Sequence, residues 1–167
     1  MIINSIISLP GDKSISHRSI MLSSIASGVS RITNLNDGED LQSTIKAMQS
    51  CGALIKQDKD LIVVTGSSLA SPKKPIDCGN SGTTSRLLTG LLSSQHLSFS
   101  LIGDESLSKR PMNRVIKPLK EMGCIIKSND GLLPLHIDAS NSFKGIDYKM
   151  PIASAQVKSA ILLAGLG

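Results

Sequence analysis

The sequence predicts an α/β (α+β) fold built from βαβαββ repeat units, two of them complete and a third just begun. Two observations support this prediction. A helix–glycine–strand pattern recurs after 71 residues, and a helix start rich in Gly, Ser and Thr occurs three times at a spacing of about 70 residues. Units of this kind bury their apolar faces only against their neighbours. The 167 residues are therefore expected to share one continuous core.

The clearest repeat joins residues 45–56 (IKAMQSCGALIK) to residues 116–127 (IKPLKEMGCIIK). The helix starts GDKSISHR and GNSGTTSR lie 68 residues apart, and a third helix start, SAQVK, begins at Ser154. We therefore expect units at about residues 9–78 and 79–150, with a truncated unit at 151–167. Because the third unit stops after one helix, we infer that the chain is a portion of a longer protein.

The first unit is expected to contain two helices, a strand between them and a closing hairpin. Hydroxyl residues ahead of an apolar run predict an N-capped helix, and glycine marks a helix end. Short β-branched runs around polar turns predict strands. The predicted elements are a helix at 14–27, a strand at 29–35, an acidic turn at 36–40, a helix at 40–51, and hairpin strands at 53–57 and 61–65.

The second unit repeats this order, and the third begins in the same way. In the third, residues 154–158 precede an apolar helical stretch at 160–164. The helices are expected to pack inside curved sheets or on one face of them. The predicted elements of the second unit are a helix at 83–94, a strand at 97–102, an acidic turn at 103–105, a helix at 111–122, and hairpin strands at 124–128 and 132–137.

Charge and composition narrow the class of partner. The net charge of +5 favours an anionic partner. The only aromatic residues are Phe99, Phe143 and Tyr148, which leaves little with which to stack nucleobases, so a small anionic molecule is favoured over nucleic acid. No apolar run approaches the roughly 18 residues of a membrane helix, and no signal or transit peptide is visible. A cytoplasmic protein without a membrane partner is expected.

The cysteines and histidines do not form a metal-binding pattern. Cys51, Cys78 and Cys124 are far apart without CxxC spacing, and the three histidines are equally scattered. We expect reduced, packed thiols, no metal site and no cofactor.

The three helix starts share one arrangement that is suited to binding anions. Each places a cation in the first turns of a helix, with Lys13 and Arg18 in the first, Arg86 in the second and Lys158 in the third. Free backbone N–H groups and the helix dipole attract anions there. Ordinary capping explains any one of these starts, but three with matching cations favour convergence on a multiply anionic ligand.

Further residues fit the same chemistry. Gly82 lets a ligand approach the backbone closely. Arg110 precedes a proline that is expected to open a helix, which would aim its guanidinium at the helix start. Asp12, Asp104 and Glu105 are interpreted as capping or charge-balancing groups, and no nucleophile motif or Walker A loop occurs. No catalytic residue is therefore expected within this chain, and His17 is expected to be packed or capping.

Four blocks resemble those of the EPSP synthases (3-phosphoshikimate 1-carboxyvinyltransferases) and occur in the same order. The blocks are LPGDKSISHR, GNSGTTSR, GDESLSKRPM and SAQVKSAILLAG, which span residues 9 to 165. The resemblance implies transfer of the enolpyruvyl group of phosphoenolpyruvate to the 5-hydroxyl of shikimate 3-phosphate, a step of chorismate and aromatic amino acid biosynthesis. It also implies a monomeric enzyme of two domains, each an inside-out α/β barrel of three βαβαββ units.

By this resemblance the chain is a partial N-terminal domain. It is expected to be inactive alone, because the family's C-terminal domain and its catalytic Asp and Glu lie beyond Gly167. The implied ligands of shikimate 3-phosphate are Lys13, Ser14, Arg18, Ser154 and Gln156. The implied ligands of phosphoenolpyruvate are Lys13, Gly82, Arg110 and Gln156.

Two alternatives to an EPSP synthase remain open from the sequence. The sister enolpyruvyl transferase acting on UDP-N-acetylglucosamine is similar, but Glu105 stands where its reactive cysteine is usual, and the first helix start has Asp-Lys-Ser rather than Lys-Asn-Ala. A non-catalytic anion-binding module related to the family is the second alternative.

Overall fold

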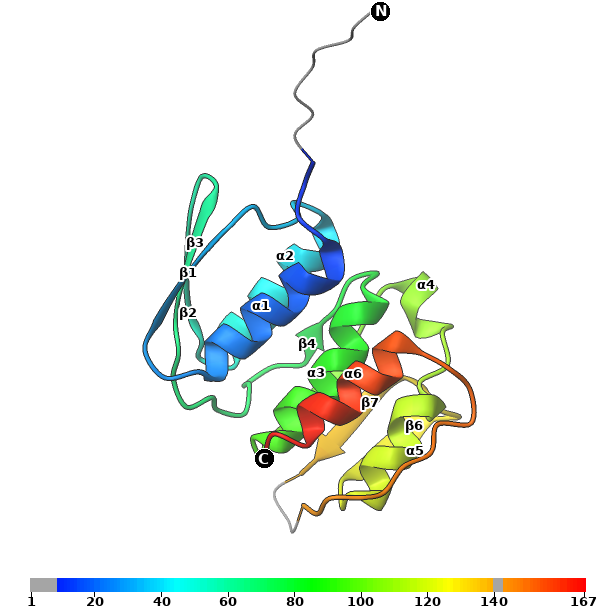
Figure 1. Ribbon diagram of the computed structural model, residues 1–167. Coiled ribbons are helices and arrows are strands. Elements are labelled where there is room, and N and C mark those ends of the chain that lie inside the picture. Colours follow the sequence, from blue (N-terminus) through cyan, green and yellow to red (C-terminus); the bar gives the residue numbers. More distant parts are fainter. Residues whose placement is uncertain (1–8, 140–142) are drawn as a thin grey trace, which may run out of the picture.

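The computed structural model describes residues 9–139 and 143–167 (Figure 1). The helices are α1 (Lys13–Ile25), α2 (Glu39–Ser50), α3 (Gly82–Ser94), α4 (Glu105–Ser108), α5 (Asn113–Glu121) and α6 (Ala155–Ala164). The strands are β1 (Val29–Thr33), β2 (Leu54–Asp58), β3 (Leu61–Thr65), β4 (Ile76–Asp77), β5 (Ser98–Ile102), β6 (Ile125–Asn129) and β7 (Leu132–Asp138).

The strands form two sheets with closely related topology. The first sheet is antiparallel in the order β1-β3-β2, and the second has the order β4-β5-β7-β6, with β4 parallel to β5. The order β5-β7-β6 therefore matches β1-β3-β2. In both sheets a hairpin closes onto the strand that follows the first helix. This is the mixed α/β arrangement that the sequence predicts.

Four of the helices, α1, α2, α3 and α6, lie between the two sheets. Figure 1 shows α1 and α2 against the three-stranded sheet, with α3 and α6 side by side next to the four-stranded sheet. Helix α3 is the central element, and most of its residues are buried. Most of its buried hydroxyls donate to carbonyl oxygens of the same helix, as in the bonds from Thr89 Oγ1 to Ser85 O (2.6 Å) and from Ser93 Oγ to Thr89 O (2.7 Å). A helix with many hydroxyl residues can therefore occupy the interior.

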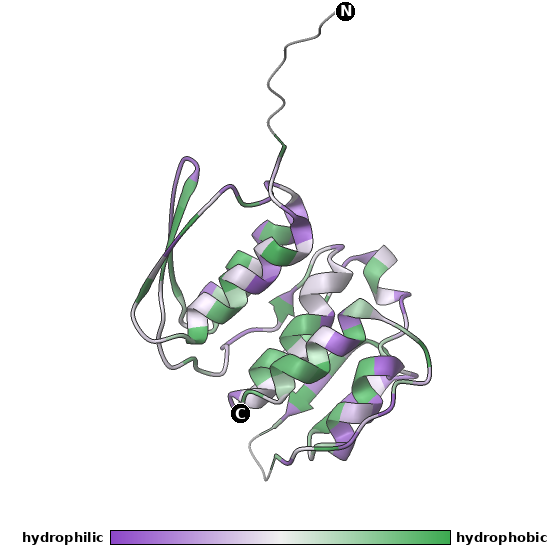
Figure 2. Ribbon diagram, viewed as in Figure 1, coloured by the Kyte–Doolittle hydropathy of each residue, from purple (hydrophilic) through white to green (hydrophobic). Residues whose placement is uncertain are grey.

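Helices α3 and α6 approach one another closely at Gly90. A Cβ built on Gly90 would lie 2.0 Å from the carbonyl oxygen of Ala160. Only glycine leaves space for this close approach. Figure 2 shows hydrophobic colours along much of α3 and α6, whereas α5 is striped with hydrophilic residues on its exposed side. The core is one cluster that runs through both sheets and the helices between them.

Most predicted elements are confirmed, including both hairpins and the glycines that end α2 and α5. Gly52 and Gly123 have φ of 94° and 112°, in the left-handed region that suits the residue after a helix. The two-residue strand β4 was not predicted because it is too short to show alternation. The single turn of α4 replaces part of the predicted acidic turn.

The predicted helix start at Pro111 is wrong. Helix α5 begins at Asn113, with Met112 at its N-cap, so Arg110 lies in the connection between α4 and α5. The carbonyl of Pro111 would pair with the N–H of Val115 in a helix that included Pro111, but it accepts from Arg86 Nη2 (3.1 Å), and Val115 N donates to the Met112 carbonyl (3.0 Å). A tertiary contact with α3 therefore outweighs the preference of proline for a first helical turn.

Candidate anion-binding site

Three helix N-termini lie at the same end of the molecule. Figure 1 shows α1, α3 and α6 running side by side with their first residues toward one end. Each begins with a side-chain cap that accepts a backbone N–H. The caps are Asp12 to Ile15 N (2.7 Å), Ser81 to Thr84 N (3.1 Å) and Ser154 to Val157 N (3.3 Å). The positive ends of three helix dipoles thus share one region, which favours an anionic ligand there.

A hydrogen-bond network at the start of α3 joins the helix-start cation Arg86 to two predicted ligands, Gly82 and Gln156. Arg86 donates from Nη1 to the carbonyl of Gly82 (3.1 Å) and to Oε1 of Gln156 (3.1 Å). It also donates from Nη2 to the carbonyl of Pro111 (3.1 Å). Gln156 in turn donates from Nε2 to the hydroxyl of Thr83 (3.0 Å). Helices α3 and α6 and the α4–α5 connection therefore meet at one half-buried guanidinium.

Arg110 approaches the same place from the α4–α5 connection. It donates to Asn80 Oδ1 (2.6 Å), to the carbonyl of Asn80 (3.3 Å) and to Ser106 Oγ (3.2 Å). Asn80 itself donates to Asp104 Oδ2 (2.7 Å), which fixes the amide that receives Arg110. Arg110 thus points at the turn ahead of α3 and not at the start of α5.

Gly82 lies between the two guanidinium groups. A Cβ on this residue would be 2.6 Å from Arg86 Nη1 and 3.4 Å from Arg110 Nη1. Burial lowers the pKa of Arg86, and the neighbouring charges of Arg110 and Arg114 lower it further. Such a gathering of like charges around a helix N-terminus would be relieved by a bound anion.

At the start of α1, Lys13 forms an ion pair with Asp40 in the first turn of α2. Ser14 is exposed on the same helix. His17 is fully buried, and its Nδ1 lies 2.7 Å from Thr44 Oγ1. Burial lowers the pKa of His17 to about 4, with Lys13 and Arg18 also lowering it and Asp40 opposing them. The expectation that His17 is packed is confirmed.

Arg18 and Lys158 line one cavity between α1 and α6. The cavity has a volume of about 490 Å³, and its other lining residues include Leu22, Ser159 and Leu162. The predicted ligand Arg18 of α1 and the helix-start cation Lys158 of α6 thus reach a common space. Ser154, which is half-buried, sits at the start of the α6 wall as its N-cap.

The three carboxylates that were expected to cap helices or balance charge do so in the structure. Asp12 caps α1, and Asp104 caps α4 by accepting from Leu107 N (2.7 Å). That bond, together with the amide of Asn80, lowers the pKa of Asp104. Glu105 pairs with Lys109 (2.6 Å). The capping and charge-balancing interpretation is confirmed for these three residues.

Sequence reasoning missed Asp40 and Asn80 as parts of this region, and it recognised Arg86 only as a helix-start cation. Asp40 was detectable as an acidic residue in the first turn of α2, but its pairing with Lys13 depends on tertiary packing. Asn80 gave no separate signal, because its role depends on the side chains of Arg110 and Asp104 that reach it.

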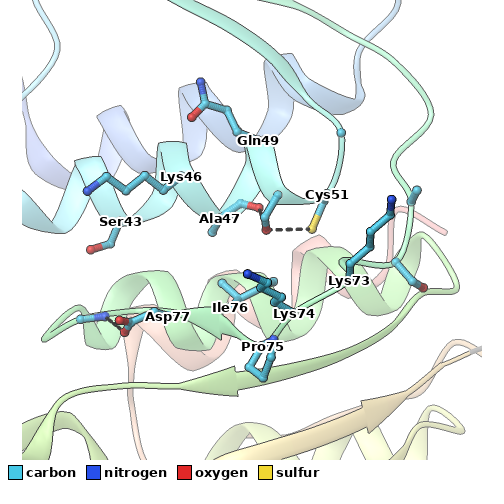
Figure 3. Close-up of a pocket in the computed structure, with 15 residues that line it drawn as sticks. Ser43, Lys46, Ala47, Gln49, Cys51, Lys73, Lys74, Pro75, Ile76 and Asp77 are labelled. Atoms are coloured by element: carbon cyan, nitrogen blue, oxygen red, sulfur yellow. Dashed lines mark hydrogen bonds between the residues drawn. The ribbon is translucent and has the colours of Figure 1, made fainter.

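A larger cavity lies elsewhere. It has a volume of about 700 Å³ and lies between α2 and the segment leading into β4. Figure 3 shows that the ammonium groups of Lys46 and Lys73 point away from one another, so these two lysines do not converge on one anion. None of the predicted site residues lines it. Burial raises the pKa of Cys51 at its edge to about 11, which makes that thiol a poor nucleophile.

Within residues 9–139 and 143–167, no cluster of three or more His, Cys, Asp or Glu could hold a metal ion. The three cysteines are free and buried, as expected. The helices of the described residues include none that is long and apolar enough to cross a membrane.

The fold and the site define an α/β protein with cations gathered at one end of its helical layer. The family model for EPSP synthase (3-phosphoshikimate 1-carboxyvinyltransferase) matches residues 2–167. The 3-phosphoshikimate 1-carboxyvinyltransferases of Vesicomyosocius okutanii and Leuconostoc citreum are 53% identical over 161 residues and 51% identical over 164 residues. These matches cover 95% and 96% of this chain, and 37% and 38% of the relatives.

A solved EPSP synthase from Acinetobacter baumannii has the same fold. It matches with a TM-score of 0.90 at 45% identity over 95% of this chain and 37% of that one. The chain belongs to the EPSP synthase family. It spans little more than a third of the length of the relatives that it matches.

Proposed function

We propose that this chain supplies part of the N-terminal domain of an enzyme that transfers the enolpyruvyl group of phosphoenolpyruvate to the 5-hydroxyl of shikimate 3-phosphate. The products would be EPSP and phosphate. The observation that carries the proposal is Gly82 at the start of α3, flanked by Arg86 and Arg110 in a chain of this family. This arrangement suits a phosphate or carboxylate that binds to a helix N-terminus.

The two substrates are assigned to neighbouring places. Phosphoenolpyruvate would bind at Gly82, Arg110 and Gln156, where the guanidinium groups converge. Shikimate 3-phosphate would bind between α1 and α6, with Arg18 at its carboxylate and Ser154 near its phosphate. Its remaining ligands would be Ser14 and Gln156, and Lys13 would contact both substrates.

The chemistry required of these residues is positioning and charge neutralisation. Both substrates are polyanions that repel one another, and cations that bind both would hold the hydroxyl near the enol carbon. The proposed reaction uses no metal and no cofactor. The acid and base that move protons would belong to the part of the enzyme outside these 167 residues, so the chain alone is expected not to turn over.

In architectural terms, we assign two βαβαββ units to about residues 9–78 and 79–150, and the start of a third to residues 151–167. The matching strand orders β1-β3-β2 and β5-β7-β6 support this division. The full-length protein is proposed to be a cytoplasmic monomer of two inside-out barrel domains.

Titration of the chain with shikimate 3-phosphate tests the assignment of Arg18. We expect saturable binding in calorimetry, weakened about tenfold or more in Arg18→Ala, because a charge-assisted hydrogen bond to an anion is lost. Arg31→Ala is the matched control, since it removes the same charge from an exposed position on β1. Equal affinity in both variants would contradict the assignment, as would a folded chain that does not bind.

Titration with phosphoenolpyruvate tests the assignment of Gly82. In Gly82→Ala the new methyl group would displace the Arg86 guanidinium and narrow the approach to Arg110. We expect affinity for phosphoenolpyruvate to fall about tenfold, while affinity for shikimate 3-phosphate changes less. An unchanged affinity for phosphoenolpyruvate would place that substrate elsewhere.

A further inference from the structure

A buried chain of polar side chains connects α1 to the start of α3. His17 Nδ1 lies 2.7 Å from Thr44 Oγ1, which lies 2.7 Å from Thr84 Oγ1, and Thr84 Oγ1 lies 2.7 Å from Ser81 Oγ. All four side chains are fully buried. They come from α1, α2, α3 and the N-cap of α3 in that order. This chain of hydrogen bonds therefore crosses the helical layer and ends at Ser81, the residue before Gly82.

The hydrogen-bond distances favour one direction of proton donation along this chain. The Thr84 hydroxyl is within reach of the Asp40 carbonyl (3.2 Å) and of Ser81 Oγ, and a carbonyl can only accept. The one proton of this hydroxyl goes to Ser81, the nearer of the two acceptors, so Thr44 donates to Thr84. His17 must then donate from Nδ1 to Thr44.

The other ring nitrogen of His17 supports the same direction. Nε2 is buried and has no hydrogen-bond partner among the described residues. A proton on Nε2 would be an orphaned buried donor, which is rarer in proteins than an under-satisfied acceptor. A proton on Nδ1 leaves only a lone pair unpaired and completes the chain.

We propose that His17 is a positioning residue, which as the Nδ1–H tautomer begins a hydrogen-bond chain that fixes the Ser81 cap and the anion-facing turn at Gly82. Ser81 accepts from both the hydroxyl and the backbone N–H of Thr84, so it is held from two sides. The backbone that faces the two guanidinium groups is thereby tied to α1 and α2. The effect on ligand affinity rests on the proposed function, whereas the tautomer and the coupling between the helices do not.

Nitrogen-15 NMR of the 167-residue chain tests the tautomer directly. We expect the His17 ring to carry its proton on Nδ1 in the unliganded protein near neutral pH, where the ring is uncharged. A ring protonated on Nε2 would overturn the proposal whether or not the chain binds any ligand.

The substitution Thr44→Val tests the coupling, because it keeps the shape of the side chain and removes the hydroxyl that joins His17 to Thr84. We expect the amide resonances of Gly82 and Thr84 to shift and the His17 tautomer to change. Thr44→Ser restores a hydroxyl and is expected to return both signals toward their original positions.

Thr89→Val is the matched control. It removes another buried threonine hydroxyl, but one that bonds within α3 through the Ser85 carbonyl. We expect Thr44→Val, but not Thr89→Val, to weaken binding of phosphoenolpyruvate by about threefold or more. If the two variants gave the same amide shifts at Gly82, the hydrogen-bond chain from His17 to Ser81 would have no positioning role. A lack of phosphoenolpyruvate binding in the unmodified chain would contradict the proposed function and leave the NMR result to decide the inference.

Discussion

Replacing Gly90 by alanine is expected to lower the free energy of unfolding by more than about 3 kcal/mol. The added methyl carbon would be placed 2.0 Å from the Ala160 carbonyl oxygen, and the two helix backbones that meet there offer no side chain to move aside. Overpacking in a core costs about 1–3 kcal/mol when side chains can adjust, and it costs more when they cannot. Urea-induced unfolding followed by circular dichroism measures the loss.

Gly145→Ala provides the control for this measurement. A Cβ on Gly145 would meet no atom within 4 Å, so this substitution is expected to change stability by less than about 0.5 kcal/mol. A Gly90→Ala variant as stable as Gly145→Ala would show that α3 and α6 pack less closely than this contact requires.

The buried His17 is expected to lower the free energy of unfolding of the protein as the pH falls below 6.5. Its pKa is about 4 in the folded state against an ordinary value of 6.5 for an exposed histidine, so the unfolded chain binds more protons between these values. The contribution of His17 to stability is complete above pH 6.5 and is lost as the pH falls toward 4. The loss is roughly 3 kcal/mol, from about 1.4 kcal/mol for each pH unit in that interval.

Urea unfolding of the chain and of His17→Gln at several pH values between about 7 and about 4 tests this expectation. Glutamine does not titrate, so the stability of the variant is expected to fall less steeply, by roughly 3 kcal/mol over the interval. The variant can be less stable at neutral pH without affecting this comparison, since only the slope is compared. If stability fell equally steeply with pH in both proteins, burial would not lower the pKa of His17 in the folded state.

Local sequence was sufficient for the features that depend on neighbours along the chain. The helices of both units, the hairpins and the glycines that end α2 and α5 follow from capping, periodicity and turn chemistry. The start of α5 was misplaced because the Pro111 carbonyl accepts from Arg86 of the distant helix α3, which the local sequence does not show. Short elements such as β4 carry too few residues to show any period.

The site was predictable to a similar degree. Three helix starts with matching cations identified one end of the molecule, and the structure joins Gly82, Arg110 and Gln156 around Arg86. The sequence could not reveal that Lys13 pairs with Asp40, or that His17 reaches Thr44. Both contacts link α1 to α2, and neither has a local signal.

The link between Arg86 and Gln156 joins residues that are 70 positions apart and draws on helix α6, which follows all the other described elements along the chain. The candidate anion site is therefore complete only when α6 has docked along α3. During synthesis, this part of the site would form after the two units that precede it. In a titration with phosphoenolpyruvate, the proposed ligand, the binding stoichiometry would thus count only molecules in which α6 has docked, while the circular dichroism signal would also include those in which α6 is still detached.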